Sequence, residues 1–313
     1  MTFRTGSITS ATPAKAMLDL LDTDLAAVGY VRAETALVVG AVTWNVYRSP
    51  GTANFFGSDW FFALGYDTTA QTALYSCVFE AWDGTGKLAD RFAPSTTGLV
   101  PAAGYVNPEA AAALPAGCTL SHLLPTTAFT YAYSALIDRV AIGAWTAATY
   151  GRFGWYIGLY DSFYSTADDP FPLVICSIGG AQFIPSSLYG SASREPMTTS
   201  ASSVNFRVHQ GVAKSSGAYT EHLWNVSAAA NSYQGGRPWV SRVRLFGRGG
   251  QFAFPRGLFR DLWAGPNETG YVSNGDRITW SSGGSAYAGV IYRATQGSSS
   301  TPPYPVPILI PEY

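Results

Sequence analysis

The stretch that most constrains the fold of this chain is an aromatic segment with a period of two, which runs from Phe153 to Phe163. One parity carries Trp155, Ile157, Leu159 and Asp161. Glycine, tyrosine and serine residues fill the other parity. Strict alternation of this kind, rich in aromatic residues, is typical of a β-strand and does not fit the 3.6-residue period of a helix.

The segments on either side of this strand predict a hairpin, a loop and a further strand. Val140 to Trp145 is apolar and rich in strand-forming residues, and Tyr150-Gly151-Arg152 supplies a turn. After the aromatic segment, Asp168-Asp169-Pro170 ends the strand, and Pro170 and Pro172 hold the following loop extended. Leu173 to Ile178 is short and apolar, so we expect a buried strand there.

The same strand pattern recurs along most of the chain. The other clear examples are Glu34 to Arg48 (one strand or a pair), Asp59 to Tyr66, Ala73 to Ala81, Ser241 to Phe246, Leu258 to Trp263, Asp276 to Trp280 and Ala286 to Ala294. Gly283-Gly284 predicts a hairpin turn between the last two. We therefore expect a mainly β protein, with antiparallel sheets of the sandwich or meander type.

One amphipathic helix is predicted near the N-terminus. Thr12 and Pro13 suit its first positions, and Gly29 suits its end. Apolar residues recur at helical spacing between them: Met17, Leu18, Leu21, Leu25 and Val28. The polar face is acidic, so we expect packing on a sheet and not binding to a membrane surface, which favours a basic face.

Composition shifts divide the chain into four expected regions. Residues 1–86 hold the helix and a β-meander, and residues 87–128 form a connecting segment rich in proline and alanine. Residues 129–300 form the main β domain, and residues 301–313 form an extended C-terminal arm.

Charge and composition exclude some classes of function. Of the 313 residues, 12% are charged and 14% aromatic, and the formal net charge is −1. Average proteins have about 25% charged residues, so this surface is unusually neutral. A nucleic-acid partner is not expected, because no basic footprint is present. A weakly charged, aromatic-rich surface instead favours burial against partner proteins or further copies of the chain.

No apolar run approaches the ~18 residues of a membrane-spanning helix, so membrane insertion is not expected.

The sequence shows no motif of a catalytic or cofactor site. Cys77, Cys118 and Cys176 are widely spaced and fit free thiols, and no histidine or cysteine cluster suggests a metal. An alternative is a ligand or calcium loop at Asp161, Asp168 and Asp169, since oxygen ligands suit Ca²⁺. The same carboxylates raise the alternative of a glycan hydrolase, which needs two positioned carboxyl groups. We expect no enzyme activity and no cofactor.

Three stretches resemble a family of tailed-bacteriophage virion structural proteins. The resemblance is carried by Thr5-Gly6 with Leu20-Leu21-Asp22, by Tyr156-Ile-Gly-Leu-Tyr160 with Pro170-Phe-Pro-Leu-Val-Ile-Cys-Ser-Ile-Gly-Gly180, and by Gly275-Asp-Arg-Ile-Thr-Trp280 with Tyr287 to Arg293. The resemblance implies a non-enzymatic, multi-copy virion component in the tail or baseplate region, made in the bacterial host cytoplasm. Its implied partners are copies of itself and other virion proteins. The alternative is a receptor- or carbohydrate-binding virion protein, a capsid decoration or tail-fibre attachment protein, with a host-surface glycan as partner.

The C-terminal segment has two interpretations. Its prolines favour an extended strand, and its apolar residues are unlike those of a free tail. The residues concerned are Pro305, Val306, Pro307, Ile308, Leu309 and Ile310. Either they pack back on their own domain, or they reach a neighbouring subunit as an assembly arm.

Overall fold

The computed structural model describes the chain in parts: residues 2–39, 41–79, 82–83, 88–89, 119–146, 151–165, 172–179, 182–183, 206–208, 218–221, 233–234, 237–238, 240–249, 252–264, 273–294 and 306–312. Within these parts the protein is mainly β, with two large antiparallel sheets and a single helix. The predicted fold class and the predicted helix are therefore confirmed.

The smaller of the two large sheets has the order β13-β8-β5-β4-β3-β2. Its strands are β13 (Gln182–Phe183), β8 (Thr119–Leu123), β5 (Ala73–Phe79), β4 (Trp60–Asp67), β3 (Val42–Ser49) and β2 (Val31–Val39). The segment around residues 34–48 thus forms a pair of strands, one of the two expected outcomes.

The larger sheet has the order β1-β9-β10-β11-β19-β22-β21-β20, with four more strands beside this path. The strands of the path are β1 (Thr2–Ile8), β9 (Phe129–Leu136), β10 (Arg139–Trp145), β11 (Gly151–Ser162), β19 (Phe252–Ala264), β22 (Val306–Glu312), β21 (Ser285–Ala294) and β20 (Arg277–Ser282). The strands beside it are β12 (Leu173–Gly179), β14 (Phe206–Val208), β15 (Ala218–Glu221) and β18 (Ser241–Gly249). Two short pairs complete the described strands: β6 (Trp82–Asp83) with β7 (Leu88–Ala89), and β16 (Tyr233–Gln234) with β17 (Arg237–Pro238).

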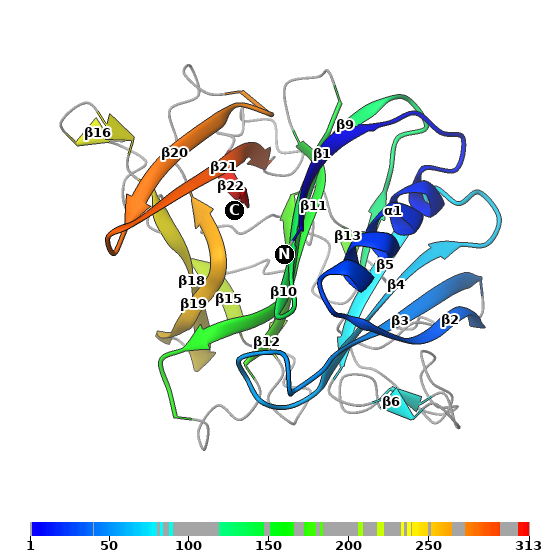
Figure 1. Cartoon of the computed structure of the whole chain (residues 1–313), viewed down its shortest axis with the longest axis horizontal. Coiled ribbons are helices and arrows are strands. Elements are labelled where there is room, and N and C mark those ends of the chain that lie inside the picture. Colours follow the sequence, from blue (N-terminus) through cyan, green and yellow to red (C-terminus); the bar gives the residue numbers. More distant parts are fainter. Residues whose placement is uncertain are drawn as a thin grey trace.

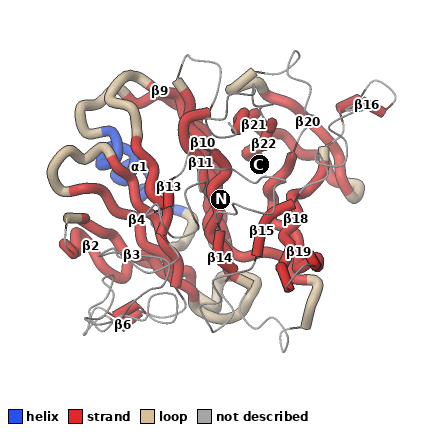
Figure 2. The backbone as a smooth tube through the Cα atoms, turned by 180° about the vertical axis from the view of Figure 1, so that it is seen from behind, coloured by secondary structure: helices blue, strands red, loops and turns tan. Residues whose placement is uncertain are grey.

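The two sheets make three layers (Figure 1). Strands β2 to β5 form one outer layer, and β1, β9, β10 and β11 form the middle layer. The larger sheet then turns back on itself, so that β21 and β22 contact β10 as a second outer layer. The view from behind shows the same order of layers (Figure 2).

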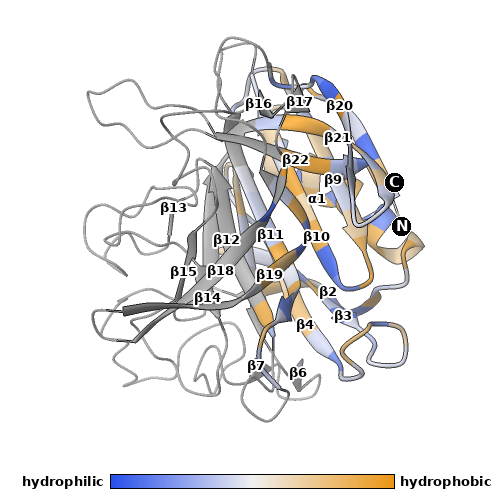
Figure 3. Cartoon of the chain, turned by 90° about the vertical axis from the view of Figure 1, so that its left-hand side faces the viewer, coloured by the Kyte–Doolittle hydropathy of each residue, from blue (hydrophilic) through white to orange (hydrophobic). Residues whose placement is uncertain are grey.

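The middle layer is buried on both faces, which explains its sequence. Every residue of β10 is buried, as expected of a continuous apolar strand covered on two sides. In β11, Trp155, Ile157 and Leu159 join the core shared with β3 and β4. Tyr156 packs edge-on against Phe259 of β19 instead. Alternate side chains of β11 therefore face opposite sides of the middle layer. Hydrophobic residues are also frequent in β21 and β22 (Figure 3).

Helix α1 (Pro13–Ala27) packs against strands of both sheets, with Met17, Leu21 and Leu25 fully buried. Its acidic residues anchor it on each side. Asp24 accepts hydrogen bonds from Arg4 of β1, at 2.6 Å, and from Tyr133 of β9.

Asp22 accepts a hydrogen bond from the Tyr47 hydroxyl of β3 at 2.8 Å, and a second from Arg32. Thr12 is the N-cap residue as predicted, but its side chain makes no capping bond. The Gln71 carbonyl accepts the Ala14 N–H instead, at 2.9 Å.

Two features of the connectivity differ from the sequence prediction. Residues 119–123 were expected within a connecting segment, but they form β8, which pairs with β5 over five residues from Ala73↔Leu123 to Cys77↔Thr119. Residues 2–8, for which no strand was predicted, form β1, which pairs with β9 of the main β region. The predicted boundaries at 86 and 128 therefore do not coincide with the sheets. Cys118 lies outside the described residues, as do the side chains of Cys77 and Cys176.

The predicted hairpin at Gly283-Gly284 is confirmed, with φ of 57° and 82° at the two glycines. The turn before β20 is also built by its sequence. Gly275 has φ of 89°, a value that favours glycine. The Asp276 carboxylate accepts the Ser273 N–H at 2.6 Å, and its carbonyl accepts the Ile291 N–H at 2.8 Å. The Gly-Asp element thus starts a strand.

Candidate functional site

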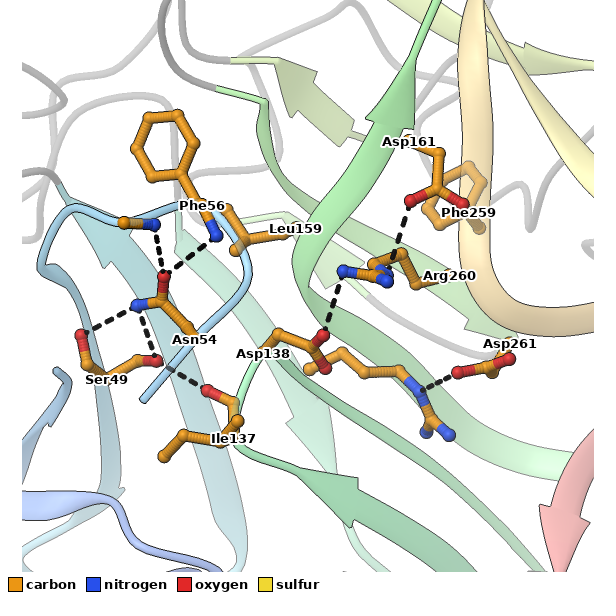
Figure 4. A network of polar contacts seen from close by, with 12 residues as sticks. Ser49, Asn54, Phe56, Ile137, Asp138, Leu159, Asp161, Phe259, Arg260 and Asp261 are labelled. Carbon is orange, nitrogen blue, oxygen red and sulfur yellow. Dashed lines mark hydrogen bonds and ion pairs between the residues drawn. The ribbon is translucent and has the colours of Figure 1, made fainter. Parts of the chain in front are cut away.

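A network of arginine and aspartate side chains lies where the three layers meet (Figure 4). Asp161, near the end of β11, has the parity of Trp155 and Leu159, so it stands at the rim of the core that those residues fill. One carboxylate oxygen of Asp161 is paired with Arg242 of β18. The other lies 3.3 Å from Nε of Arg260 in β19. The carboxylate therefore ties β11 to two neighbouring strands.

Arg260 connects the network to the other two layers. Its Nη1 lies 3.1 Å from Asp138, in the turn between β9 and β10. Its guanidinium also stacks on the ring of Phe55, 3.5 Å from the ring centre. Phe55 belongs to the loop between β3 and β4, so one side chain of β19 contacts both the middle layer and the outer layer of β2 to β5. A cation over an aromatic face contributes about 0.5–2 kcal/mol, depending on its exposure.

Asn54 holds the Phe55 loop in place (Figure 4). Its side-chain oxygen accepts the N–H groups of Phe56 and Gly57, each at 3.0 Å, and its amide donates to the carbonyls of Ser49 and Ser58. The Ser49 hydroxyl donates to the Ile137 carbonyl in the β9–β10 turn. The loop is thus fixed against the same turn that carries Asp138.

Arg139 is a second arginine of the network and is fully buried. Its Nη1 donates to the carbonyl and hydroxyl oxygens of Ser134, each at 3.3 Å. Its Nε lies 3.7 Å from a carboxylate oxygen of Asp261 in β19. Gly158 makes room for this arrangement, because a Cβ there would lie 2.5 Å from the Arg139 Cα.

The electrostatics of the network favour internal pairing. Burial raises the pKa of Asp138 above its usual range, while Arg260 and Arg139 act in the opposite direction. Burial also raises the pKa of Tyr156 and Tyr30 well above the ordinary tyrosine value, so both hydroxyls stay protonated. Three arginines face three aspartates, so the charges balance. Such a cluster suits a clamp between layers, because its carboxylates are already bound by cations.

The candidate loop residues of the sequence are only partly placed by the structure. Asp161 belongs to the network, whereas Asp168 and Asp169 lie outside the described residues. Both oxygens of Asp161 face arginines, a setting that disfavours a bound cation. Among the described residues, no group of three or more histidine, cysteine or acidic residues could hold a metal ion. The structure does not describe the other two carboxylates of the predicted loop, so the calcium and hydrolase hypotheses remain untested.

The C-terminal segment lies in a sheet of its own chain. Val306 to Glu312 pairs with β21 over seven residues, and Ile308 and Leu309 also pair with β19. Leu309 and Ile310 are fully buried, and Pro305 lies outside the described residues. Pro307 and Pro311 lie outside the two residues that pair on both sides, so neither proline removes an N–H from the doubly paired part of the strand. This matches the interpretation in which the segment packs on its own domain; a role as an arm between subunits remains a prediction.

Most residues of the network were not predicted from the sequence: Asp138, Arg139, Arg242, Arg260, Asp261 and Phe55. One signal was available. In a chain with so few charges, Arg260-Asp261 inside the aromatic strand Leu258 to Trp263 predicts buried charges that need partners. The identity of those partners depends on strands that are distant in the sequence.

Comparison of the chain with known protein families and with curated proteins finds no match. Within the described parts of the chain, no helix has the length and apolar character needed to cross a membrane.

Proposed function

We propose that the protein is a multi-copy, non-enzymatic structural component of a tailed-phage virion, located in the tail or baseplate region. The supporting observation is where the segments that resemble this class lie in the fold. Tyr156 to Tyr160 is fully buried in the middle layer, and Gly275 to Trp280 forms a turn and an edge strand. These residues shape and hold the scaffold, as expected of a protein whose task is mechanical.

The charge network supports the same proposal. Its carboxylates pair with arginines and join the three layers, which is unlike a catalytic pair that must be free to exchange protons. A weakly charged chain, whose described strands β2 and β20 each end a sheet, suits repeated contacts with identical neighbours.

Mass spectrometry of purified phage particles tests this proposal. The protein is expected in several copies per particle, at a constant ratio to the major tail protein. A particle preparation that contains the tail proteins but lacks this chain would overturn the proposal. Its presence only in lysates, and never in particles, would have the same meaning.

A second candidate is binding of a host-surface glycan at the network rim. The observation in its favour is a set of exposed aromatic rings near Asp161: Phe55 is 50% exposed, and Phe163 and Tyr164 follow the end of β11 at 54% and 43%. Exposed rings stack on sugar faces, and charged groups beside them bind hydroxyls. Glycan-array binding that is lost in Phe163→Ala but kept in Val38→Ala, a change at another exposed apolar residue, would support it. An array without hits would overturn the glycan-binding candidate.

A further inference from the structure

We propose that the outer edge of β20 pairs with β20 of a second copy of this chain, antiparallel and across a two-fold axis at Thr279. The larger sheet would then continue from one copy into the other. This inference deepens the proposed function, on which it rests, by naming a surface that joins two copies.

The β20 edge is regular over its described length. It pairs with β21 through six residues, from Arg277↔Val290 to Ser282↔Ser285, without a register shift. Strand β20 ends the sheet order, so no described strand pairs with its other edge. It contains no proline or lysine, residues that commonly protect such an edge, and its one charged residue, Arg277, stands at its first position. Unpaired N–H and C=O groups in a straight row are a template for another strand.

Two other long edges in the described structure differ from that of β20. Strand β2 has two register shifts against β3, and Ala36 within it has φ of 53°. Bulges of this kind bend a strand and interrupt pairing. Strand β1 lies against α1, held by the ion pair between Arg4 and Asp24. The contrast with the bulged β2 marks β20 as a regular edge suited to pairing.

The side chains of β20 alternate in a way that suits self-pairing. Thr279 and Ser281 are exposed, whereas Ile278 and Trp280 are half-buried against the small core of Trp263, Ile291 and Leu309. Trp280 stacks on Tyr287 with ring centres 5.7 Å apart and meets Trp263 edge-on at 5.5 Å. This packing orders the strand before any partner binds, which lowers the entropy lost on pairing.

A two-fold axis at Thr279 gives a consistent register. Directly opposed residues of an antiparallel pair lie on the same face of the sheet. Ile278 of each copy would face Trp280 of the other, so the half-buried apolar stripe becomes continuous. Thr279 would face Thr279, and Arg277 would face Ser281, so no like charges oppose each other. A register shifted by one would place Ile278 opposite exposed Ser281 and break the stripe.

Substitution to lysine tests the edge. Analytical ultracentrifugation of the full chain is expected to show a species of twice the 33.3 kDa chain mass. Thr279→Lys would set two positive charges face to face at the axis and shift the species to the monomer, because opposed like charges destabilise a strand pair. Thr35→Lys, the same change at an exposed threonine of the bulged β2 edge, is the matched control and should leave the dimer intact. Circular dichroism spectra that match the wild type would show that both variants fold.

Cysteine substitution tests the register independently. Opposed Cα atoms in an antiparallel pair are about 4.5–5.5 Å apart, within the range of a disulfide. Thr279→Cys should therefore form a covalent dimer on mild oxidation, well above the background that Thr35→Cys gives with the native cysteines. A wild-type monomer, a dimer that survives Thr279→Lys, or cross-linking no greater than that of Thr35→Cys would overturn the proposal. Detection of the chain in particles is a separate measurement, so the virion assignment can stand or fall independently.

Discussion

Gly143 of β10 lies directly against the ring of Tyr292 in β21, at the contact between the middle layer and the second outer layer. A Cβ at position 143 would come within 2.6 Å of the ring carbons and 3.1 Å of Ile310. Tyr292 is fully buried, so its ring has no solvent into which it can move. A residue without a side chain is therefore required where two layers touch.

The first prediction follows from this contact. Gly143→Ala should lower the free energy of unfolding by about 1–3 kcal/mol, the usual cost of overpacking a tight core. Chemical denaturation measures the change. In a Tyr292→Leu background, Gly143→Ala should lower the free energy of unfolding by less, because the opposing ring is removed. Equal costs in the two backgrounds would show that the Gly143–Tyr292 contact is not responsible.

The second prediction concerns Arg260, which contacts Asp138, Asp161 and Phe55. Arg260→Ala should destabilise the protein by about 1.5–3 kcal/mol, typical of lost hydrogen bonds to charged groups. Arg48→Ala removes an exposed pair with Asp59 and should cost only about 0–1 kcal/mol. Urea denaturation of both variants makes the comparison, and similar costs would mean that the network does not clamp the layers.

The third prediction concerns pH. Burial raises the pKa of Asp138 above its ordinary value of 3.8, so the folded state binds this proton more readily than the unfolded state. Its contribution to stability is therefore greatest below 3.8 and is lost as pH rises through the folded pKa. Relative to Asp138→Asn, the wild type should gain stability as pH falls from neutral towards 3.8. Unfolding free energies of the two proteins at several pH values give the difference, and an opposite slope would refute the raised pKa.

The fourth prediction addresses the C-terminal strand. Leu309 is fully buried between β19 and β21. Leu309→Ala should therefore lower the free energy of unfolding, measured by chemical denaturation, by about 2–5 kcal/mol. Val38→Ala, at a position 61% exposed, should change stability by no more than about 0.5 kcal/mol.

Deletion of residues 306–313 extends this test, because it would leave β19 and β21 without their shared neighbour. The melting temperature of the shortened chain should fall well below that of the full chain. An unchanged melting temperature together with failed assembly would favour the assembly-arm interpretation instead.

Local pattern alone determined much of this fold. The period of two from Phe153 to Phe163 identified a strand and separated its two faces, because successive side chains of a strand must point in opposite directions. Helical spacing and a proline–glycine frame identified α1, and Gly283-Gly284 identified the last hairpin, because positive φ is easy only for glycine. These features depend on neighbours within a few residues.

Only the tertiary structure decided which strands meet. The pairing of β1 with β9, the place of β8 beside β5, and the position of β22 between β19 and β21 join segments far apart in the chain. The partners of Asp161 and Arg260 follow from those pairings. An alternating strand can satisfy its hydrogen bonds beside many others, so its local sequence does not name its neighbour. Burial of the three layers against each other selects one arrangement, and the charge network exists only within it.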